Sequence, residues 1–282
     1  MALHDELGMR MKGNYEEVSK TRLTKRTPVI VRLDGRAFHT FTRKFVKPFD
    51  DVLIATMQDT MLELCKNIQG CELGYTQSDE ISLLLIDYKE LESQAFFDYE
   101  VQKICSITAS MATLFFNDAF WSNVERAKRA GEITEDQCEI YNKVKMTAMF
   151  DSRCFNIPRE EVTNYFYWRQ LDATRNSIQM VGQANFSHRE LHKKSSSDIQ
   201  EMLHERMNIN WNDYPTVKKR GTCGIKKDFY IKGLTCISAE SAKIEECEGW
   251  QKRGKWCIDT EIPIFKGEGR NYIERFVDYE NK

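Results

Sequence analysis

The sequence predicts an α+β fold in which helices cover an antiparallel or mixed β-sheet. Its 282 residues, of which 41% are hydrophobic and 30% charged, suffice for one large domain with a substantial core. The first half alternates short apolar segments with longer stretches of helical periodicity, in the order strand, helix, hairpin, helix, strand. No apolar run is long enough to cross a bilayer and no secretory leader is recognisable, so we expect a cytoplasmic protein without a membrane segment.

Turn and capping residues delimit the elements of the first half. Pro28 precedes a β-branched strand that ends at Asp34, and Asp50 opens an amphipathic helix that Gly70 ends. In chain order, we predict a helix over residues 15–23, a strand over 27–33, a helix over 50–70, strands over 71–75 and 81–86, helices over 101–116 and 121–129, and a strand over 145–156.

The second half is predicted to be helical first and strand-like afterwards. A helix over residues 158–180 is followed by shorter helices around His188 and over residues 197–207. The tail beyond them has alternating and β-branched patterns that are typical of strands. We expect residues 157–282 to pack on residues 1–156 as one structural unit.

Several common classes of protein are disfavoured by motifs that the chain lacks. Nine cysteines, an odd number without a C-x-x-C pair, argue against a disulfide framework or a zinc ribbon, and we expect most thiols to pack as small hydrophobic side chains in a reducing cytoplasm. His188 and His192 have metal-ligand spacing, but Arg189 stands where a zincin needs glutamate. No P-loop, G-x-G-x-x-G run or G-x-S-x-G elbow occurs.

Basic residues are concentrated in one part of a chain whose net charge is only −2. Residues 20–47 hold nine lysines and arginines and one acid, Asp34, so this segment carries +8 and the remainder −10. A positive field of this kind attracts phosphates, although a solvated basic face has the same composition. Lys218, Lys219 and Arg220 form a second basic cluster that is a candidate for contact with an RNA backbone.

Acidic residues occur where predicted strands begin or end. Asp34 follows the first apolar strand, and Asp79 and Glu80 lie in the polar turn before the third. If these strands are neighbours, the carboxylates meet at one edge of the sheet and supply the hard oxygen ligands that Mg²⁺ prefers. Two such ions suit phosphoryl transfer because they bridge an attacking hydroxyl and a phosphate. The Gly35 carbonyl can also reach a metal, because no side chain covers that peptide.

The neighbouring residues suit a nucleoside triphosphate. Arg36, Lys47 and the backbone amides from Ala37 to His39 can hold phosphates, and the Ser78 hydroxyl adds a hydrogen bond. Asp-Gly and Ser-Asp-Glu are also ordinary turn sequences, so the pattern alone leaves both interpretations open.

Several separated motifs, in this order, are similar to those of one enzyme family. They are VIVRLDGRAFHTFT (29–42), the Lys47-Pro48 pair, GYTQSDEISLLL (74–85), FDSRCFNIP (150–158) and YFYWRQLD (165–172). Over about residues 15–221 the chain resembles the histidine-tRNA guanylyltransferase family, and within it the Thg1-like branch of template-directed 3′-to-5′ RNA polymerases.

The resemblance implies that residues 1–156 form a catalytic core similar to the palm of ordinary polymerases. The family's ligands for two Mg²⁺ ions correspond to Asp34, the Gly35 carbonyl and Asp79, with Glu80 beside them as a further catalytic residue. Its nucleotide-binding residues correspond to Asp34, Gly35, Arg36, Ala37, Phe38, His39, Lys47, Ser78 and Asp79.

The resemblance also implies a reaction and its partners. ATP, GTP or other nucleoside triphosphates are the expected substrates, together with a tRNA that spans the subunits of a homotetramer. The 5′-monophosphate of the tRNA is activated with ATP, or the end already carries a triphosphate. The 3′-hydroxyl of an incoming nucleotide then attacks this end, and AMP or pyrophosphate leaves. Arg169 and Arg175 join the second basic cluster as candidates for tRNA contact.

Two departures from the family pattern bear on specificity. The family's D-G-R-G ends here in Ala37. The D-x-H-I-N-N-L-Y-N motif of the enzymes that read the histidine anticodon corresponds to residues 172–180, where its histidine, second asparagine, tyrosine and last asparagine are absent. We therefore expect repair of 5′-truncated tRNA, with guanosine addition to histidine tRNA as the alternative.

Two other functions are compatible with parts of the pattern. A palm-type nucleotide cyclase would use the same triphosphate site without RNA. A non-catalytic tRNA-binding protein would explain the basic segment but not the acidic residues, which repel RNA unless a metal neutralises them. Residues 225–282 lie outside the resemblance, and the sequence assigns them no role.

Overall fold

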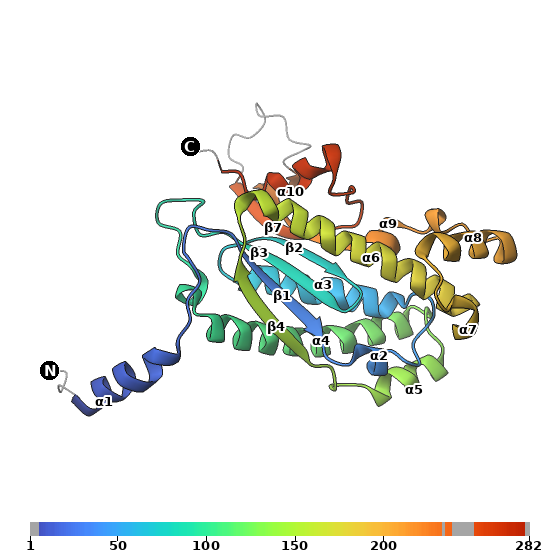
Figure 1. Ribbon diagram of the computed structural model, residues 1–282, viewed down its shortest axis with the longest axis horizontal. Helices are drawn as coiled ribbons and strands as arrows, with labels where there is room; N and C mark the ends of the chain where they lie inside the picture. Colours follow the sequence, from blue (N-terminus) through green and yellow to red (C-terminus); the bar gives the residue numbers. More distant parts are fainter. Residues whose placement is uncertain (1–5, 233–234, 239–250, 280–282) are drawn as a thin grey trace.

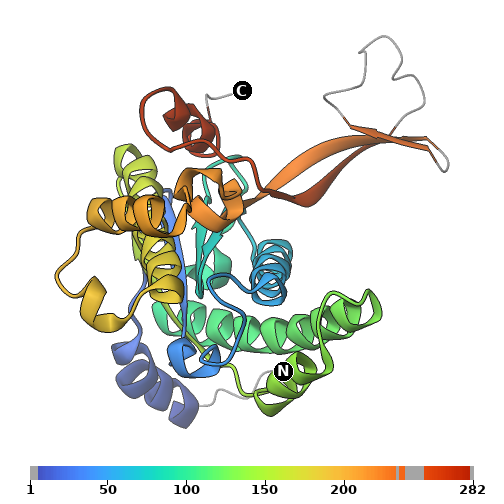
Figure 2. The ribbon, with the colours of Figure 1, turned by 90° about the vertical axis from the view of Figure 1, so that its right-hand side faces the viewer.

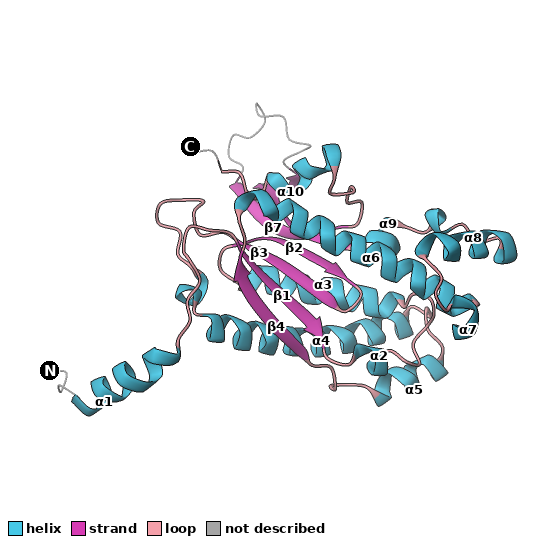
Figure 3. Cartoon of the chain, viewed as in Figure 1, coloured by secondary structure: helices cyan, strands magenta, loops and turns pink. Residues whose placement is uncertain are grey.

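The computed structural model describes residues 6–232, 235–238 and 251–279, in which helices and strands alternate along the chain (Figures 1 and 3). The α-helices are α1 (Glu6–Met11), α2 (Phe38–Phe41), α3 (Asp51–Asn67), α4 (Val101–Arg129), α5 (Glu135–Lys143), α6 (Val162–Asn185), α7 (His188–Leu191), α8 (Ser196–Met207), α9 (Thr216–Arg220) and α10 (Asn271–Glu274). The strands are β1 (Val29–Gly35), β2 (Cys71–Gln77), β3 (Glu80–Leu85), β4 (Phe150–Asn156), β5 (Thr222–Lys232), β6 (Thr235–Ser238) and β7 (Gln251–Asp259).

These strands form one sheet in the order β4-β1-β3-β2-β5-β6, with β7 also paired to β5. All the pairings between them are antiparallel. The strand β5 pairs with β2 through its first residues, and with β7 it continues as a two-stranded ribbon that extends beyond the helical layers (Figure 2). The C-terminal region therefore contributes strands to the same sheet as the N-terminal half.

Helices cover both faces of the central strands, as the predicted α+β fold requires (Figure 2). Successive residues of a strand face opposite layers. In β1, Val29, Val31 and Leu33 pack in one apolar cluster with α3 and α4, whereas Ile30 packs in a second cluster with α6. The C-terminal segment completes this second cluster with Phe265, so it has a structural role. The predicted fold class is confirmed.

The N-terminal helical segment lies earlier than predicted. It runs from α1 through a π-helical turn (Lys12–Glu16) and a 3₁₀ turn (Glu17–Ser19), whereas the sequence predicts a helix over residues 15–23. The chain leaves the helix because its next residues join another segment. Arg22 forms a β-bridge with Glu100, and the Leu23 amide donates to the Tyr99 carbonyl at 3.0 Å.

The helix α4 is continuous where the sequence predicts two helices. Asn117 and Phe120, at the predicted break, are buried rather than exposed. The Asn117 amide group donates to the Thr113 and Ala148 carbonyls, and Phe120 stacks on Phe116. The sequence analysis also misses α5, which a reciprocal cap of Thr134 and Gln137 begins, and the short α9.

Boundaries elsewhere differ by a few residues. The strand β4 begins at Phe150 rather than at residue 145, and α6 extends five residues beyond Met180. The strand β7 ends at Asp259, because Ile262 and Phe265 turn back into the second apolar cluster. The helix around His188 and the helix from about residue 197 are confirmed as α7 and α8.

The cysteines whose side chains the structure describes are all free thiols, and Cys65, Cys71, Cys138 and Cys223 are buried. This agrees with the expected packing as small hydrophobic residues. Among the described helices, none combines the length and the apolar character that a bilayer span requires.

Candidate active site

Three carboxylates lie side by side across β4, β1 and β3. Asp34 is paired with Glu80 of β3 on one side and with Asp151 of β4 on the other. Side chains directly opposite each other in a sheet share a face, and here it is the face that α6 covers. The sequence analysis predicts that Asp34 and Glu80 meet but misses Asp151, whose only signal is its place in the FDSR motif.

Asp79 lies in the two-residue turn between β2 and β3, next to the end of β1. The Gly35 amide donates a hydrogen bond of 3.0 Å to the Asp79 carbonyl, which ties the end of β1 to this turn. The Ser78 hydroxyl donates to Asp79 Oδ1 at 3.0 Å. The backbone thus brings the two stretches that contain Asp34 and Asp79 to one edge of the sheet, as the sequence predicts.

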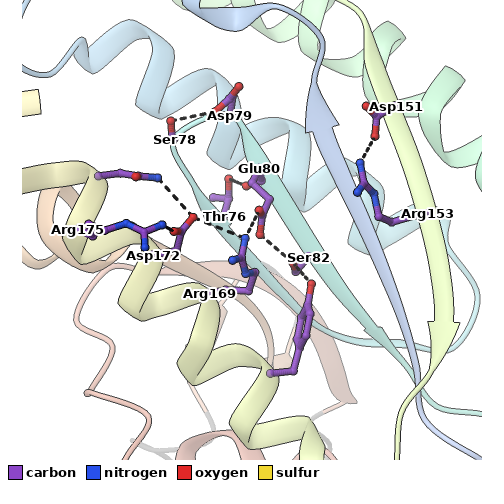
Figure 4. Close-up of polar contacts among 12 residues, drawn as sticks. Thr76, Ser78, Asp79, Glu80, Ser82, Asp151, Arg153, Arg169, Asp172 and Arg175 are labelled. Atoms are coloured by element: carbon purple, nitrogen blue, oxygen red, sulfur yellow. Dashed lines mark hydrogen bonds and ion pairs between the residues drawn. The ribbon is translucent and has the colours of Figure 1, made fainter. Parts of the chain in front are cut away.

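Glu80 is engaged by a buried arginine of α6. Figure 4 shows its carboxylate directed toward Arg169, and the Nη1–Oε2 distance is 2.6 Å. The two side chains are only 9% and 7% exposed. Arg169 Nη1 also lies 3.7 Å from Asp172 Oδ2. The sequence analysis assigns Arg169 to tRNA contact, and here the structure corrects it, because the guanidinium is buried in this ion pair.

A cleft of about 400 Å³ opens beside the Ser78–Asp79 turn. Its lining includes seven of the predicted nucleotide-binding residues, namely Gly35, Ala37, Phe38, His39, Lys47, Ser78 and Asp79. Two residues of α6 that the sequence analysis does not propose, Met180 and Gln183, complete one wall. Asp34 and Arg36 do not line the cleft, and the Arg36 amide donates to the Met149 carbonyl at 2.8 Å.

The loop after β1 has a backbone suited to binding anions. Ala37, at the departure from the family's glycine, has left-handed angles of φ 55° and ψ 35°, which glycine adopts without steric cost. Within the described ranges, the amides of Ala37, Phe38 and His39 have no hydrogen-bond acceptor. A Cβ on Gly35 would lie 2.4 Å from the buried Phe38 ring, so this position requires glycine.

The carboxylates of the site hold their protons more tightly than usual. Burial raises the pKa of Asp34, and the charge of Asp151 raises it further. Burial also raises the pKa of Asp79, with a smaller contribution from Asp34. For Glu80, burial raises the pKa against the opposing effect of Arg169. Crowded, partly desolvated carboxylates of this kind are stabilised by a cation.

The donors at this edge fit Mg²⁺ that shares its ligands with a substrate. Asp34 and Asp79 offer carboxylate oxygens and Gly35 a carbonyl oxygen. In the part of the chain that the structure describes, no three His, Cys, Asp or Glu side chains are arranged to hold an ion by themselves. Mg²⁺ often takes only one or two carboxylates and completes its octahedron with water and phosphate oxygens. This donor set therefore fits magnesium better than a metal that needs an all-protein cage.

The raised pKa of Asp34 predicts a pH-dependent effect of its neutralisation. In the metal-free protein the folded state binds the carboxyl proton more tightly than the unfolded chain does. Its stability contribution is therefore full below the ordinary pKa of 3.8 and is lost as the pH rises through the raised pKa. The asparagine variant does not lose stability in this way. We therefore expect its unfolding free energy to exceed that of the wild type by an amount that grows as the pH rises from 3.8 through the raised pKa of Asp34. Urea titrations in chelator at several pH values would measure the difference, and a constant difference would contradict the prediction.

The remaining candidates for tRNA contact lie on α6 and α9. Lys218 is 23% exposed and its Nζ lies 2.7 Å from an Asp51 carboxylate oxygen, while Lys219 donates to a backbone carbonyl. Arg220 is half-buried, and Arg175 is exposed and paired with Asp172. Their contact with tRNA stays a prediction.

Comparison with known proteins points to one family. The family model described as Thg1, tRNAHis guanylyltransferase, matches residues 9–158. A probable tRNA(His) guanylyltransferase of Dictyostelium discoideum is 32% identical over 213 residues, which cover 71% of this chain and 75% of that protein.

Solved structures agree over the full length. Two structures of a bacterial tRNA(His) guanylyltransferase (Thg1)-like protein, one in complex with ATP and one with GTP, are 39% identical to this chain. They match with TM-scores of 0.77 and 0.72, over 98% and 97% of this chain and 100% and 99% of theirs. The Saccharomyces cerevisiae tRNA(His) guanylyltransferase, at 21% identity and a TM-score of 0.58 over 83% of this chain and 97% of its own, shares the fold.

Proposed function

The chain belongs to the Thg1 family of tRNAHis guanylyltransferases, which are nucleotidyltransferases, and from this premise we propose that it rebuilds the 5′ end of truncated tRNA. Nucleotides are added in the 3′–5′ direction, with the opposite strand of the acceptor stem as template. ATP activates the end, and GTP or other nucleoside triphosphates are added to it.

The proposed reaction has two transfer steps. A 5′-phosphate oxygen of the RNA bonds to the α-phosphorus of ATP while the bond to pyrophosphate breaks, which leaves AMP on the RNA end. The 3′-hydroxyl oxygen of the incoming nucleotide then bonds to the terminal phosphorus of the RNA. The bond to AMP breaks, and the hydroxyl proton passes to water. An end that already carries a triphosphate releases pyrophosphate instead.

The observation that carries this proposal is the arrangement of Asp34 and Asp79 at one edge of the sheet, where Asp79 and Gly35, the residue after Asp34, line the cleft. Asp34, the Gly35 carbonyl and Asp79 would hold two Mg²⁺ ions, which when bound stabilise the charge that develops on the transferred phosphate. Lys47 and the free amides of residues 37–39 would orient the triphosphate. Glu80 would support the metal ligands without binding the ions itself, through its ion pair with the buried Arg169 of α6.

Guanosine addition to histidine tRNA is the second candidate, because relatives such as the Dictyostelium protein are named for it. Two residues of α6 favour repair. Ser177, at an asparagine of the histidine-reading motif, donates to the Lys218 carbonyl at 2.7 Å and accepts from Trp211 Nε1 at 3.0 Å. Met180, at the last asparagine, lines the cleft with a thioether in place of an amide. Neither offers the amide group of the histidine-specific motif.

A substrate panel tests the proposal. The protein is incubated with Mg²⁺, the four nucleoside triphosphates and either 5′-truncated tRNAs or a histidine tRNA that lacks its extra guanosine. We expect template-dependent extension of several truncated tRNAs and no product in chelator. Addition only to histidine tRNA would favour the second candidate.

Two outcomes would contradict both candidates. Formation of a cyclic nucleotide without RNA would indicate a cyclase. Chelator-insensitive tRNA binding by a folded protein that transfers nothing would indicate a binding protein. Binding of tRNA itself should weaken steeply with salt, because each phosphate contact releases a counterion.

We also propose, from the family resemblance, that residues 1–156 are the catalytic core and that the protein is a homotetramer in the cytoplasm. Light scattering coupled to size-exclusion chromatography, with and without tRNA, would measure the assembly. A monomer in both conditions would contradict it.

A further inference from the structure

The helix α5 has no part in the two transfer steps, yet one of its side chains reaches the wall of the nucleotide cleft. Tyr141 is only 2% exposed and does not itself line the cleft. Its hydroxyl donates a hydrogen bond of 2.8 Å to Asp50 Oδ2, 91 residues earlier in the chain. Asp50 ends the segment 45–50, which contains Lys47 and contributes to the cleft lining. Tyr141 therefore contacts this wall from behind.

Asp50 joins three parts of the structure through its buried carboxylate. Oδ1 accepts the Leu53 amide at 2.9 Å, which caps the start of α3. Oδ2 accepts the Val46 amide at 3.1 Å together with the Tyr141 hydroxyl. The side chain is 5% exposed and all three donors are uncharged, so the loss of one of them leaves the carboxylate poorly solvated. The Tyr141 hydroxyl thus helps to hold Asp50, and with it the backbone next to Lys47.

The ring of Tyr141 holds the other end of the same segment. It meets the Phe45 ring edge to face, with centroids 4.9 Å apart and an interplanar angle of 87°. Both rings also contact Phe120 of α4, at centroid distances of 5.7 Å and 5.8 Å. One tyrosine therefore contacts residues on both sides of Lys47, through its ring at Phe45 and through its hydroxyl at Asp50.

The side chain of Lys47 is weakly restrained by its own contacts. It is exposed, and its ammonium group donates to the Thr42 carbonyl at 3.3 Å. A lysine binds phosphate as a point charge on a flexible stem, so a shift of its backbone changes the distance between the ammonium group and the phosphates. The two contacts of Tyr141 limit such a shift.

The Tyr141 hydroxyl is a constant donor rather than a titrating group. Burial raises the pKa of this tyrosine, and the charge of Asp50 raises it further. The hydroxyl therefore keeps its proton at neutral pH, and the hydrogen bond to Asp50 does not depend on pH there.

We propose that Tyr141 is a positioning residue for the triphosphate site, because it holds the segment 45–50 so that Lys47 can reach the phosphates. The inference rests on the proposed function, in which Lys47 orients the triphosphate. The helix α5, which contributes no residue to the cleft lining, thereby acquires a role in binding. A tyrosine that only fills the core would affect stability and leave the affinity for phosphates unchanged.

The test removes the hydroxyl and keeps the ring. Tyr141→Phe is compared with Tyr99→Phe, which removes the hydroxyl of another buried tyrosine that is hydrogen-bonded to a buried carboxylate, that of Asp87. This second pair lies at the end of the sheet opposite Asp34, and neither residue lines the cleft. Calorimetry with Mg²⁺ measures the Kd of inorganic tripolyphosphate and of ATP, and thermal melting measures the stability of each variant.

The two tyrosine variants should differ in binding even where both lower the melting temperature. We expect Tyr141→Phe to raise both dissociation constants about tenfold, in keeping with the loss of one hydrogen bond to a charged group, and Tyr99→Phe to leave them unchanged. With a truncated tRNA that carries a 5′-triphosphate, KM for the incoming nucleotide should rise by a similar factor at an unchanged kcat, because ground state and transition state lose the same binding.

A double-mutant cycle shows whether the effect passes through Lys47. In a Lys47→Met background, Tyr141→Phe should raise the Kd of tripolyphosphate less than about twofold, because the group that it positions is gone. Equal factors in the two backgrounds would overturn the inference. An unchanged Kd in Tyr141→Phe, or an equal loss of affinity in Tyr99→Phe, would overturn it as well.

Failure of the proposed function would give a different result. A wild-type protein that binds tripolyphosphate but transfers no nucleotide would refute the proposed function, and the cycle would still decide whether Tyr141 acts through Lys47. A wild-type protein that binds neither tripolyphosphate nor ATP would overturn both.

Discussion

Asp34→Asn and Asp79→Asn are each expected to lower nucleotide transfer by at least about 1,000-fold while the protein stays folded, because each removes one of the two carboxylates that we propose as magnesium ligands. Among the residues that the structure describes, neither carboxylate has an ion-pair partner: Asp34 faces Glu80 and Asp151 across the sheet, and Asp79 receives a hydrogen bond from the neighbouring serine. Transfer rates at saturating Mg²⁺ and thermal melting in chelator measure the two effects.

A matched control separates this effect from a general loss of negative charge. Asp118 of α4 is exposed and far along the chain from the site, so Asp118→Asn should retain wild-type transfer. Full activity of either site variant would refute the assignment of metal ligands. A melting temperature well below that of the wild type would instead indicate that the carboxylates support the fold.

Arg169→Met is expected to lower the free energy of unfolding by about 3–5 kcal/mol, because it leaves the Glu80 carboxylate buried without its partner. The two side chains have almost no exposure to water, so solvent cannot replace the lost ion pair. Transfer should fall as well, since Glu80 is directly opposite Asp34 in the sheet. Urea denaturation gives the stability, and the rate with truncated tRNA gives the activity.

Two further variants make this prediction specific. Adding Glu80→Gln to Arg169→Met removes the unpaired charge, so most of the lost stability should return. Arg175→Met, on the same helix, removes an arginine that is 66% exposed and should cost less than about 1 kcal/mol. Equal destabilisation by Arg169→Met and Arg175→Met would show that burial of the ion pair does not matter.

Local patterns in the sequence are sufficient to predict the strand ends and the acids that follow them. The β-branched run before Asp34 defines β1, and the polar turn before the apolar run of β3 identifies Asp79. The antiparallel sheet then brings these residues together, because a hairpin and a neighbouring strand leave few other pairings. The same reasoning identifies the loop that holds Ala37 and Lys47 at the cleft.

Contacts between distant segments could not be predicted in this way. Arg169 and Glu80 are 89 residues apart, and a WRQ helix gives no local sign that its arginine is buried. Asp151 meets Asp34 only because β4 takes the outer position beside β1. The pocket between α3, β2, α6 and α9 could not be predicted either, since four separate elements contribute its walls. Each of these features depends on tertiary packing rather than on periodicity.

The pairing of β2 with β5 has a consequence for any attempt to shorten the protein. The strand β2 leads into the turn with Asp79, and β5 covers its outer backbone from Leu73 to Thr76. A truncated chain that stops at residue 156 would lack β5 and leave the backbone edge of β2 unpaired. An exposed, apolar strand edge promotes aggregation. The smallest soluble fragment should therefore extend past Ile225, well beyond the segment that contains the carboxylates of the candidate site.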